Sequence, residues 1–306
     1  MLKGYLLEKY TNMGDAITSA RFLDEAKKQE IDLRIVGIAD CHVSGEDGGH
    51  VIWKGEDLKE NAPDLVINRY KFGEIKDRIN TYTGNTFNNI GSFNKYLSKG
   101  AQRSELSFLW SGEKAILSYP KTLMIHRLSD VGENVKLIRD QLGFPVVAKG
   151  LLGSCGAEVT LLDNEKEVQN YLRIWQENKN AYAEEERLFQ KFLSDTEGSD
   201  VRSLCVQGEV LGSMIRKGPS GDFRSNVALG GTVKETTILP EIREAAKRIF
   251  EHTGLFCFGL DLLPDREGFA FCEINVMPGL SGIEEATGRN MTGEILYRIR
   301  QECLHK

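Results

Sequence analysis

Residues 255–282, LFCFGLDLLPDREGFAFCEINVMPGLSG, contain two apolar runs on either side of the turn sequence PDREG. This pattern predicts a β-hairpin of two buried strands, because Pro, Asp and Gly favour a turn between strand-forming runs. Asp261 and Glu273 interrupt the apolar runs. A buried carboxylate needs a partner, so the hairpin is expected to carry more than a structural role.

Simple side-chain alternation places three polar residues of the hairpin together. With the turn centred near Arg266, Asp261 is expected roughly opposite Phe271. Asp261, Glu273 and Asn275 then share one face. Two carboxylates and an amide oxygen suit a magnesium ion that also holds nucleotide phosphates. The alternative is a pair of edge carboxylates that face solvent, which the apolar flanks disfavour.

A second candidate site lies in PVVAKGLLGSCGAEVTLL, residues 145–162, where a predicted buried strand ends at Lys149. Glycine allows backbone N–H groups to approach phosphate oxygens, and a lysine at the strand end adds a mobile positive charge. Neither a Walker A loop nor a Rossmann fingerprint is present. We expect a phosphate-binding turn, although taken alone such a turn is more often structural. Its candidate residues are Gly153, Ser154 and Gly156.

Cationic residues recur on the predicted strands between these two segments. They are Arg202 in SDVRSLCV, Arg216 and Lys217 in GSMIRKG, and Arg224 with Asn226 in GDFRSNVALGG. The planar guanidinium donates two parallel hydrogen bonds to carboxylate or phosphate. A solvated charged face would explain any one of them, but their placement beside the acidic hairpin favours a site for a polyanion.

Composition bounds the class of protein. The chain has 306 residues, 41% hydrophobic and 27% charged, which allows a substantial core divided among two or three domains. A net charge of -6 without a long basic run argues against a nucleic-acid partner. The six cysteines occur without CxxC, and the opening residues lack the apolar core of a signal peptide. We therefore expect a cytoplasmic protein with reduced thiols and no membrane partner.

The order of predicted elements divides the chain. Residues 1–86 alternate strands and a helix as a small parallel α/β unit, and a polar Asn/Gly/Ser-rich stretch from residue 80 to 119 marks a boundary. Beyond it, strands and helices alternate in an α+β pattern that includes a helix capped by Gly254. Polar residues at the ends of the first strands border a cleft or are simple loop residues: Thr11, Asn12, Asp40, Asn68 and Arg69.

Taken in order, these segments resemble the RimK-type ATP-grasp ligases from about Phe87 to the C-terminus. The matching motifs are Lys99 in FNNIGSFNKYLSKG, Lys149 in VVAKG, the hinge RLFQKFL, Asp200 with Arg202, FRSN at 223–226, the pair Gly230 and Gly231, Asp261, and EINVMPGLSGIEEATG at 273–288.

The resemblance implies a fold, a domain division and an activity. The fold would be an ATP-grasp fold of mixed α/β and α+β class, with a pre-ATP-grasp domain at 1–86, a lid domain at 87–189 and a C-terminal domain at 190–306. The activity would be ATP-dependent ligation of a carboxylate to an amine through an acyl phosphate, with release of ADP and phosphate. Small-molecule or peptide substrates and a homo-oligomer would also follow.

The resemblance also implies roles for individual residues. Lys99 and Lys149 would contact the α- and β-phosphates under the 153–156 turn, and Asp200 would bind the ribose. The remaining implied sites are the adenine hinge at Gln190, Lys191, Phe192 and Leu193, a cofactor contact at Arg202, two Mg²⁺ ions (or Mn²⁺) at Asp261, Glu273 and Asn275, and acyl-phosphate contacts at Arg216, Arg224 and Asn226.

Departures from the family pattern leave alternatives open. Lys191 stands where the hinge has Glu, Leu229 stands where close relatives have Arg, and Lys95 competes with Lys99 because the following region is longer than usual. A glutathione-synthetase-like short-peptide ligase and a non-catalytic ATP-binding protein remain as alternatives. Arg69, Arg289 and Lys217 are candidate contacts for a substrate carboxylate, with solvated surface as the alternative.

Overall fold

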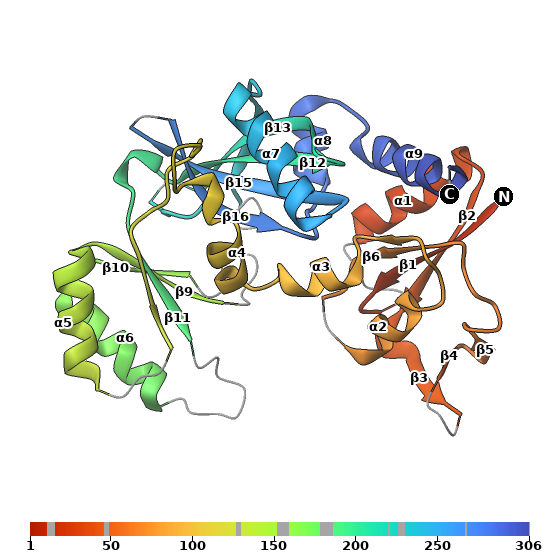
Figure 1. Cartoon of the computed structure of the whole chain (residues 1–306), viewed down its shortest axis with the longest axis horizontal. Coiled ribbons are helices and arrows are strands. Elements are labelled where there is room, and N and C mark those ends of the chain that lie inside the picture. The colour runs from red at the N-terminus through yellow and green to blue at the C-terminus, as the bar shows by residue number, and fades with distance from the viewer. Residues whose placement is uncertain are drawn as a thin grey trace.

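The structure is a computed structural model that describes residues 1–10, 16–45, 49–71, 73–126, 130–151, 159–177, 186–219, 221–225, 230–266 and 268–305. Three main sheets follow one another across the molecule (Figure 1). The small sheet of residues 122–191 lies at one end, the five-stranded sheet in the middle, and the N-terminal sheet at the other end. Within the described ranges, no helix has the length and apolar content needed to cross a membrane.

The N-terminal region confirms the expected parallel α/β unit. Its elements are β1 (Leu2–Glu8), α1 (Ala16–Lys28), β2 (Ile31–Gly37), η1 (Ile38–Asp40), β3 (Cys41–Ser44), β4 (His50–Trp53), β5 (Glu56–Asp57), β6 (Leu65–Asn68), α2 (Glu74–Asn80) and β7 (Thr86–Phe87). The parallel sheet has the order β2-β1-β6-β7, and Tyr5, Leu6 and Leu7 on β1 are fully buried. Such continuous burial is typical of a parallel strand covered on both faces. The antiparallel sheet β3-β4-β5 was not predicted.

The polar stretch after β7 forms short helices rather than an open linker. They are α3 (Ile90–Lys95), α4 (Lys99–Glu105) and η2 (Ser107–Leu109). Asn89 and Ser98 cap the first two by accepting hydrogen bonds from backbone N–H groups. Phe93 and Leu106 are fully buried in the core of the five-stranded sheet. Residues 88–119, which the sequence assigns to the lid, therefore pack against the C-terminal part of the chain, because their apolar side chains are buried in the core of the five-stranded sheet.

The lid is an antiparallel sheet with both helices against it (Figure 1). Its elements are β8 (Thr122–Ile125), α5 (Val131–Leu142), β9 (Val146–Gly150), β10 (Val159–Leu162), α6 (Glu165–Glu177) and β11 (Arg187–Lys191), in the strand order β10-β9-β11-β8. Ile138, Leu172 and Phe189 are fully buried between helices and sheet. β11, which contains the first residues of the expected hinge, thus continues the lid sheet to Lys191, past the predicted domain end at residue 189.

The C-terminal part contains the hairpin predicted from residues 255–282. Its elements are η3 (Ser194–Thr196), β12 (Ser199–Val206), β13 (Glu209–Lys217), β14 (Thr232–Glu235), α7 (Pro240–Thr253), β15 (Cys257–Asp265), β16 (Gly268–Asn275), α8 (Ser281–Thr287) and α9 (Met291–Leu304). All neighbours in the order β14-β13-β12-β15-β16 are antiparallel. The predicted glycine cap of α7 is confirmed, with Gly254 in the left-handed conformation at φ 65°.

The last helix returns to the N-terminal sheet. Ile295 and Ile299 on α9 share a buried cluster with Phe22 on α1, and α9 lies beside α1 in Figure 1. Arg69, at the end of β6, donates a hydrogen bond to the carbonyl of Pro278 at 3.3 Å and lies 3.5 Å from Glu8. The N-terminal sheet is thus joined to the segment that follows β16, next to the acidic hairpin.

Candidate active site

A pocket of about 290 Å³ opens between the lid sheet and the five-stranded sheet. The predicted cofactor, acyl-phosphate and metal residues within the described ranges all line it: Lys99, Lys149, Gln190, Lys191, Phe192, Leu193, Asp200, Arg202, Arg216, Arg224, Asp261, Glu273 and Asn275. Strands from both sheets, the start of α4 and the segments after β11 and β13 supply these side chains. The predicted positions Gly153, Ser154, Gly156 and Asn226, together with Leu229, Thr11 and Asn12, lie outside the described residues.

Strand register sets opposite charges beside one another in the five-stranded sheet. Asp200 on β12 lies opposite Arg216 on β13. Arg202, two residues further along β12, lies opposite Asp261 on β15. Asp261 in turn lies opposite Glu273 on β16. Because directly paired residues and residues two apart point to the same side of a sheet, these side chains form one charged face.

The hairpin register differs from the prediction. Asp261 pairs with Glu273 rather than with Phe271, while Phe271 pairs with Leu262. Cys272 is therefore the extra residue of a β-bulge between these two pairs. In an unbroken ladder Cys272 would lie opposite Asp261, and Glu273 would point to the other face of the sheet. Asp261 and Glu273 thus share one face of the sheet, as expected, but they do so because of the bulge and not because of simple alternation.

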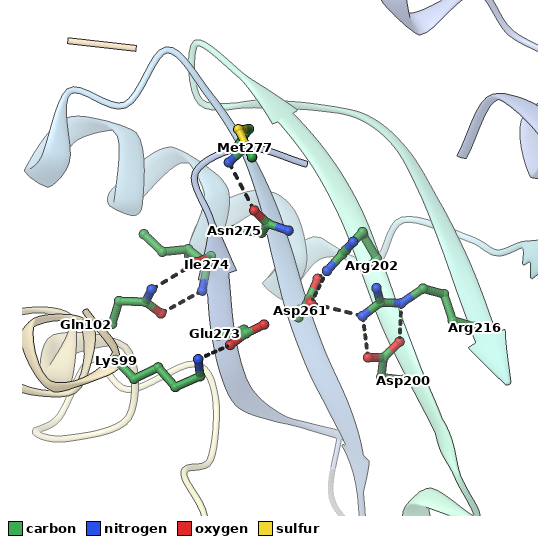
Figure 2. A network of polar contacts seen from close by, with 10 residues as sticks. All are labelled: Lys99, Gln102, Asp200, Arg202, Arg216, Asp261, Glu273, Ile274, Asn275 and Met277. Carbon is green, nitrogen blue, oxygen red and sulfur yellow. Dashed lines mark hydrogen bonds and ion pairs between the residues drawn. The ribbon is translucent and has the colours of Figure 1, made fainter. Parts of the chain in front are cut away.

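Two aspartates and two arginines of this face form a connected, buried ion-pair network (Figure 2). Arg202 donates to both oxygens of Asp261, at 2.7 Å from Nε and 2.5 Å from Nη2. Arg216 donates to both oxygens of Asp200, also at 2.7 Å and 2.5 Å. Its Nη2 reaches Asp261 as well, at 2.9 Å. The network is thus balanced in charge, and Arg216 bridges the two carboxylates.

Burial and pairing act in opposite directions on these groups. Burial raises the pKa of Asp200 against the lowering effect of Arg216. Burial also acts to raise the pKa of Asp261, but Arg202 and Arg216 outweigh it and hold that pKa below its usual value. The two carboxylates raise the pKa of Arg216 despite its burial. The two guanidinium groups therefore favour the ionised form of Asp261, which is the form that can bind a metal ion.

The donor chemistry of the hairpin fits Mg²⁺. Glu273 lies 3.4 Å from Nζ of Lys99, and the side-chain oxygen of Asn275 accepts a hydrogen bond from the backbone N–H of Met277 at 3.0 Å (Figure 2). No group of three His, Cys, Asp or Glu side chains converges within the described residues. Mg²⁺ does not need one, because phosphate and water oxygens complete its shell. Asp261 could join the shell by exchanging a guanidinium contact for the ion.

The two candidate lysines before the lid occupy different places. Lys99 lines the pocket together with Lys149 of β9, and its Nζ lies 3.4 Å from Glu273. Lys95 instead pairs with Glu105 at 2.7 Å, and its side chain is half exposed. The geometry therefore places Lys99, and not Lys95, where a nucleotide phosphate could be reached.

The hinge side chains make contacts within the lid. Gln190 donates from Nε2 to the hydroxyl of Thr122 at 2.9 Å. Lys191 donates from Nζ to the carbonyl of Phe144 at 3.1 Å. Lys191, which stands where the family pattern has Glu, is thus a structural link between the hinge and the turn before β9.

Gln102 on α4 is a site residue that sequence reasoning missed. Its Nε2 donates to the carbonyls of Ile274, at 2.9 Å, and Tyr96, at 2.7 Å, and its Oε1 accepts from the N–H of Ile274 at 2.8 Å (Figure 2). The side chain thus pairs with the outer edge of β16, which is the edge strand of its sheet. Ile274 lies between the two predicted metal ligands of β16. No local sequence signal could reveal a contact across 172 positions.

The three candidate contacts for a substrate carboxylate, Arg69, Arg289 and Lys217, do not line the pocket. Arg69 joins β6 to the carbonyl of Pro278, as described above, and Arg289 donates to the carbonyl of Leu211. Lys217 ends β13 with its side chain exposed. Arg69 and Arg289 thus link elements of the fold and do not line the pocket.

Comparison with known proteins agrees with this geometry. Residues 101–299 match the model of the RimK-like ATP-grasp domain. A probable alpha-L-glutamate ligase of Cellvibrio japonicus is 29% identical over 289 residues, 94% of this chain and 92% of that protein. One from Syntrophotalea carbinolica is 33% identical over 213 residues, 70% of this chain and 68% of its own length.

Solved structures share the fold at low sequence identity. The macrocyclase MdnC of Microcystis aeruginosa, bound with its precursor peptide MdnA, superposes with a TM-score of 0.70 at 13% identity, covering 98% of this chain and all of that one. D-alanyl-alanine synthetase A of Vibrio cholerae gives a TM-score of 0.70 at 12% identity, covering 100% of this chain and 99% of that chain. These likenesses confirm the ATP-grasp fold. With its pocket lysines, its acidic hairpin and a family model that matches residues 101–299, the chain belongs to the RimK-like ATP-grasp family of C–N bond-forming ligases.

Proposed function

We propose that this chain activates a carboxylate as an acyl phosphate and joins it to the amine of an amino acid, with L-glutamate as the first candidate. The observation that carries the proposal is one pocket that is lined by Lys99, Lys149, Asp261 and Glu273, with Nζ of Lys99 3.4 Å from Glu273. Lysines and carboxylates around one pocket suit a metal-bound nucleotide between them.

The chemistry needs positioning and charge neutralisation more than a nucleophilic side chain. A carboxylate oxygen of the acid attacks the γ-phosphorus of ATP, and ADP leaves. The amine then attacks the acyl carbon, phosphate leaves, and the amine loses a proton. Lys99 and Lys149 would bind the nucleotide phosphates, while Arg216 and Arg224 would face charge that develops on the acyl phosphate. The hinge backbone at 190–193 would hold adenine.

Asp261, Glu273 and Asn275 would hold the metal. Magnesium bound there supplies charge neutralisation for the phosphates. We propose two ions, with Mn²⁺ as a substitute. Asp261 on β15 lies opposite Glu273 on β16, and Asn275 is two residues further along β16, so the three side chains present oxygens at more than one position of the hairpin. Arg202 would remain on the Asp261 side as a contact to the cofactor.

The substrate class is suggested by relatives and by one partly exposed arginine. The curated relatives quoted above are named glutamate ligases, and several structural neighbours are complexed with precursor peptides. Arg224 lines the pocket and pairs with Asp222 through Nε at 3.0 Å and Nη2 at 2.8 Å. A substrate carboxylate could replace Asp222 on the guanidinium. We therefore propose an acidic amino acid as the amine and a peptide or small-molecule acid as its partner.

The test is ADP release with Mg-ATP across a panel of amino acids, dipeptides and glutamate-containing acids. Glu273→Gln should abolish stimulation, because it removes a metal-ligand charge while keeping the shape. Glu244→Gln, an exposed residue of α7, is the matched control and should act as the native chain does. Stimulation by thiol dipeptides alone would favour the glutathione-synthetase-like alternative, and nucleotide binding without stimulation by any pair would contradict the ligase.

A further inference from the structure

Asp200 and Arg216 form an ion pair that is almost completely buried. The two residues lie directly opposite each other on β12 and β13, and only 4% and 5% of their surfaces are exposed. Both carboxylate oxygens of Asp200 accept from the guanidinium of Arg216. Ser225, in the FRSN segment, also acts to lower the pKa of Asp200. Asp200 thus interacts with groups of β13 and of the segment that carries Arg224.

Arg216 has a second carboxylate partner whose proposed role is different. Its Nη2 lies 2.9 Å from an oxygen of Asp261, which is the proposed metal ligand at the centre of Figure 2. A metal ion on Asp261 would compete for that oxygen with the guanidinium. Asp200 would then be the carboxylate that keeps Arg216 in place.

We infer that Asp200 is a positioning residue for Arg216, and not a ligand of the nucleotide ribose. This inference rests on the proposed function, in which Arg216 faces the acyl phosphate. With a metal ion on Asp261, a contact from Asp200 to the ribose that displaced the bidentate pair would leave the buried guanidinium of Arg216 without a carboxylate partner. That costs far more than one hydroxyl hydrogen bond returns. A fixed guanidinium also needs no reorganisation when charge develops during the reaction.

The first arm of the test observes the ion pair directly and requires no turnover. The Nε–H proton of Arg216 should give a slowly exchanging NMR signal in the native chain, assigned by its loss in Arg216→Gln. Adding Mg-ADP should leave that signal protected. Loss of protection on Mg-ADP binding would overturn the inference, because it would mean that Asp200 leaves Arg216 for the nucleotide.

The second arm measures whether Asp200 recognises ribose hydroxyls. Dissociation constants for Mg-ADP and its 2′,3′-dideoxy analogue are compared in the native chain and in Asp200→Asn. The ratio of the two constants should stay within about twofold of the native ratio. A ratio that falls to one in the variant, when the native chain discriminates, would assign Asp200 to the ribose and overturn the inference.

The third arm separates positioning from binding during turnover. Asp200→Asn should lower kcat by about 100-fold, in the range expected for losing one fixed charge-stabilising group, while KM for ATP changes by less than about threefold. The double variant with Arg216→Gln should be no slower than Arg216→Gln alone. An unchanged kcat in Asp200→Asn, or independent losses that multiply in the double variant, would overturn the inference.

Folding and the wider proposal are controlled separately. If Asp200→Asn alone does not fold, the double variant with Arg216→Gln, which removes both buried charges, is used for the ribose comparison. If no acid and amine pair stimulates ADP release, the proposed ligase fails, but the NMR and binding arms still decide the role of Asp200.

Discussion

Replacing Gln102 by leucine tests how the metal-binding edge of β16 is held. The change removes three hydrogen bonds, to both backbone groups of Ile274 and to the carbonyl of Tyr96. Gln102 is buried, so these groups would be left without partners away from water. At about 1 kcal/mol or more for each, the free energy of unfolding should fall by about 3–5 kcal/mol. Ser104→Leu, an exposed position on the same helix, should change it by less than about 0.5 kcal/mol.

The same change should weaken metal binding, because Ile274 lies between Glu273 and Asn275. Removing hydrogen bonds that hold the backbone between two metal ligands should lower metal affinity by about 10- to 100-fold, as for other groups that orient metal ligands. Urea unfolding and thermal melting measure the stability, and titration of Mg²⁺ at fixed ADP measures the affinity. A stability loss below about 1 kcal/mol, with unchanged Mg²⁺ affinity, would refute the view that Gln102 completes the edge strand.

Three further outcomes follow from the structure. Lys99→Met should weaken Mg-ADP binding by about 10- to 100-fold through loss of a charge-assisted contact. Lys95→Met should change the affinity by less than about twofold. Equal effects of the two changes in calorimetry would contradict the assignment of Lys99 as the phosphate contact. Burial lowers the pKa of Lys76 below its ordinary 10.5, so the unfolded chain binds a proton that the folded chain releases and stability rises as pH increases towards 10.5. Lys76→Met should flatten that rise in unfolding measurements across this range, and identical slopes would exclude a contribution from Lys76. Gly218→Ala would place a Cβ 1.9 Å from the carbonyl oxygen of Arg224. The free energy of unfolding should therefore fall by about 1–3 kcal/mol in the same assay. An unchanged unfolding midpoint would show that the backbone at Arg224 moves away without cost.

The bulge at Cys272 shows where pattern reasoning from the sequence ends. Alternation predicts that Asp261 and Glu273 share a face, and they do. The predicted opposition of Asp261 and Phe271 is wrong, because Asp265 pairs with Gly268, so that the turn is centred just after Arg266, and because the ladder contains an extra residue. Register depends on how two whole strands pack, and a single bulged residue leaves no mark on the local pattern.

The segment from residue 88 to 119 is a second case. Its Asn, Gly and Ser content predicts a boundary, yet two of its polar residues, Asn89 and Ser98, are the caps of short helices. Phe93 and Leu106 then pack into a core that also contains Val201, Phe258 and Phe271 of the five-stranded sheet, which lie far along the chain. The caps are local and readable, but the choice of the C-terminal core over the lid core is not.

The sequence alone determined which chemistry this protein could carry. Side-chain type and spacing are local properties, so the acidic hairpin, the strand lysine before the glycine-rich turn and the series of strand arginines could be identified without coordinates. The tertiary structure decided which of these groups meet. Asp200 pairs with Arg216, Asp261 pairs with Arg202, and Gln102 is hydrogen-bonded to the edge of β16. These contacts depend on strand register and on packing between segments far apart in the chain, which no local pattern contains.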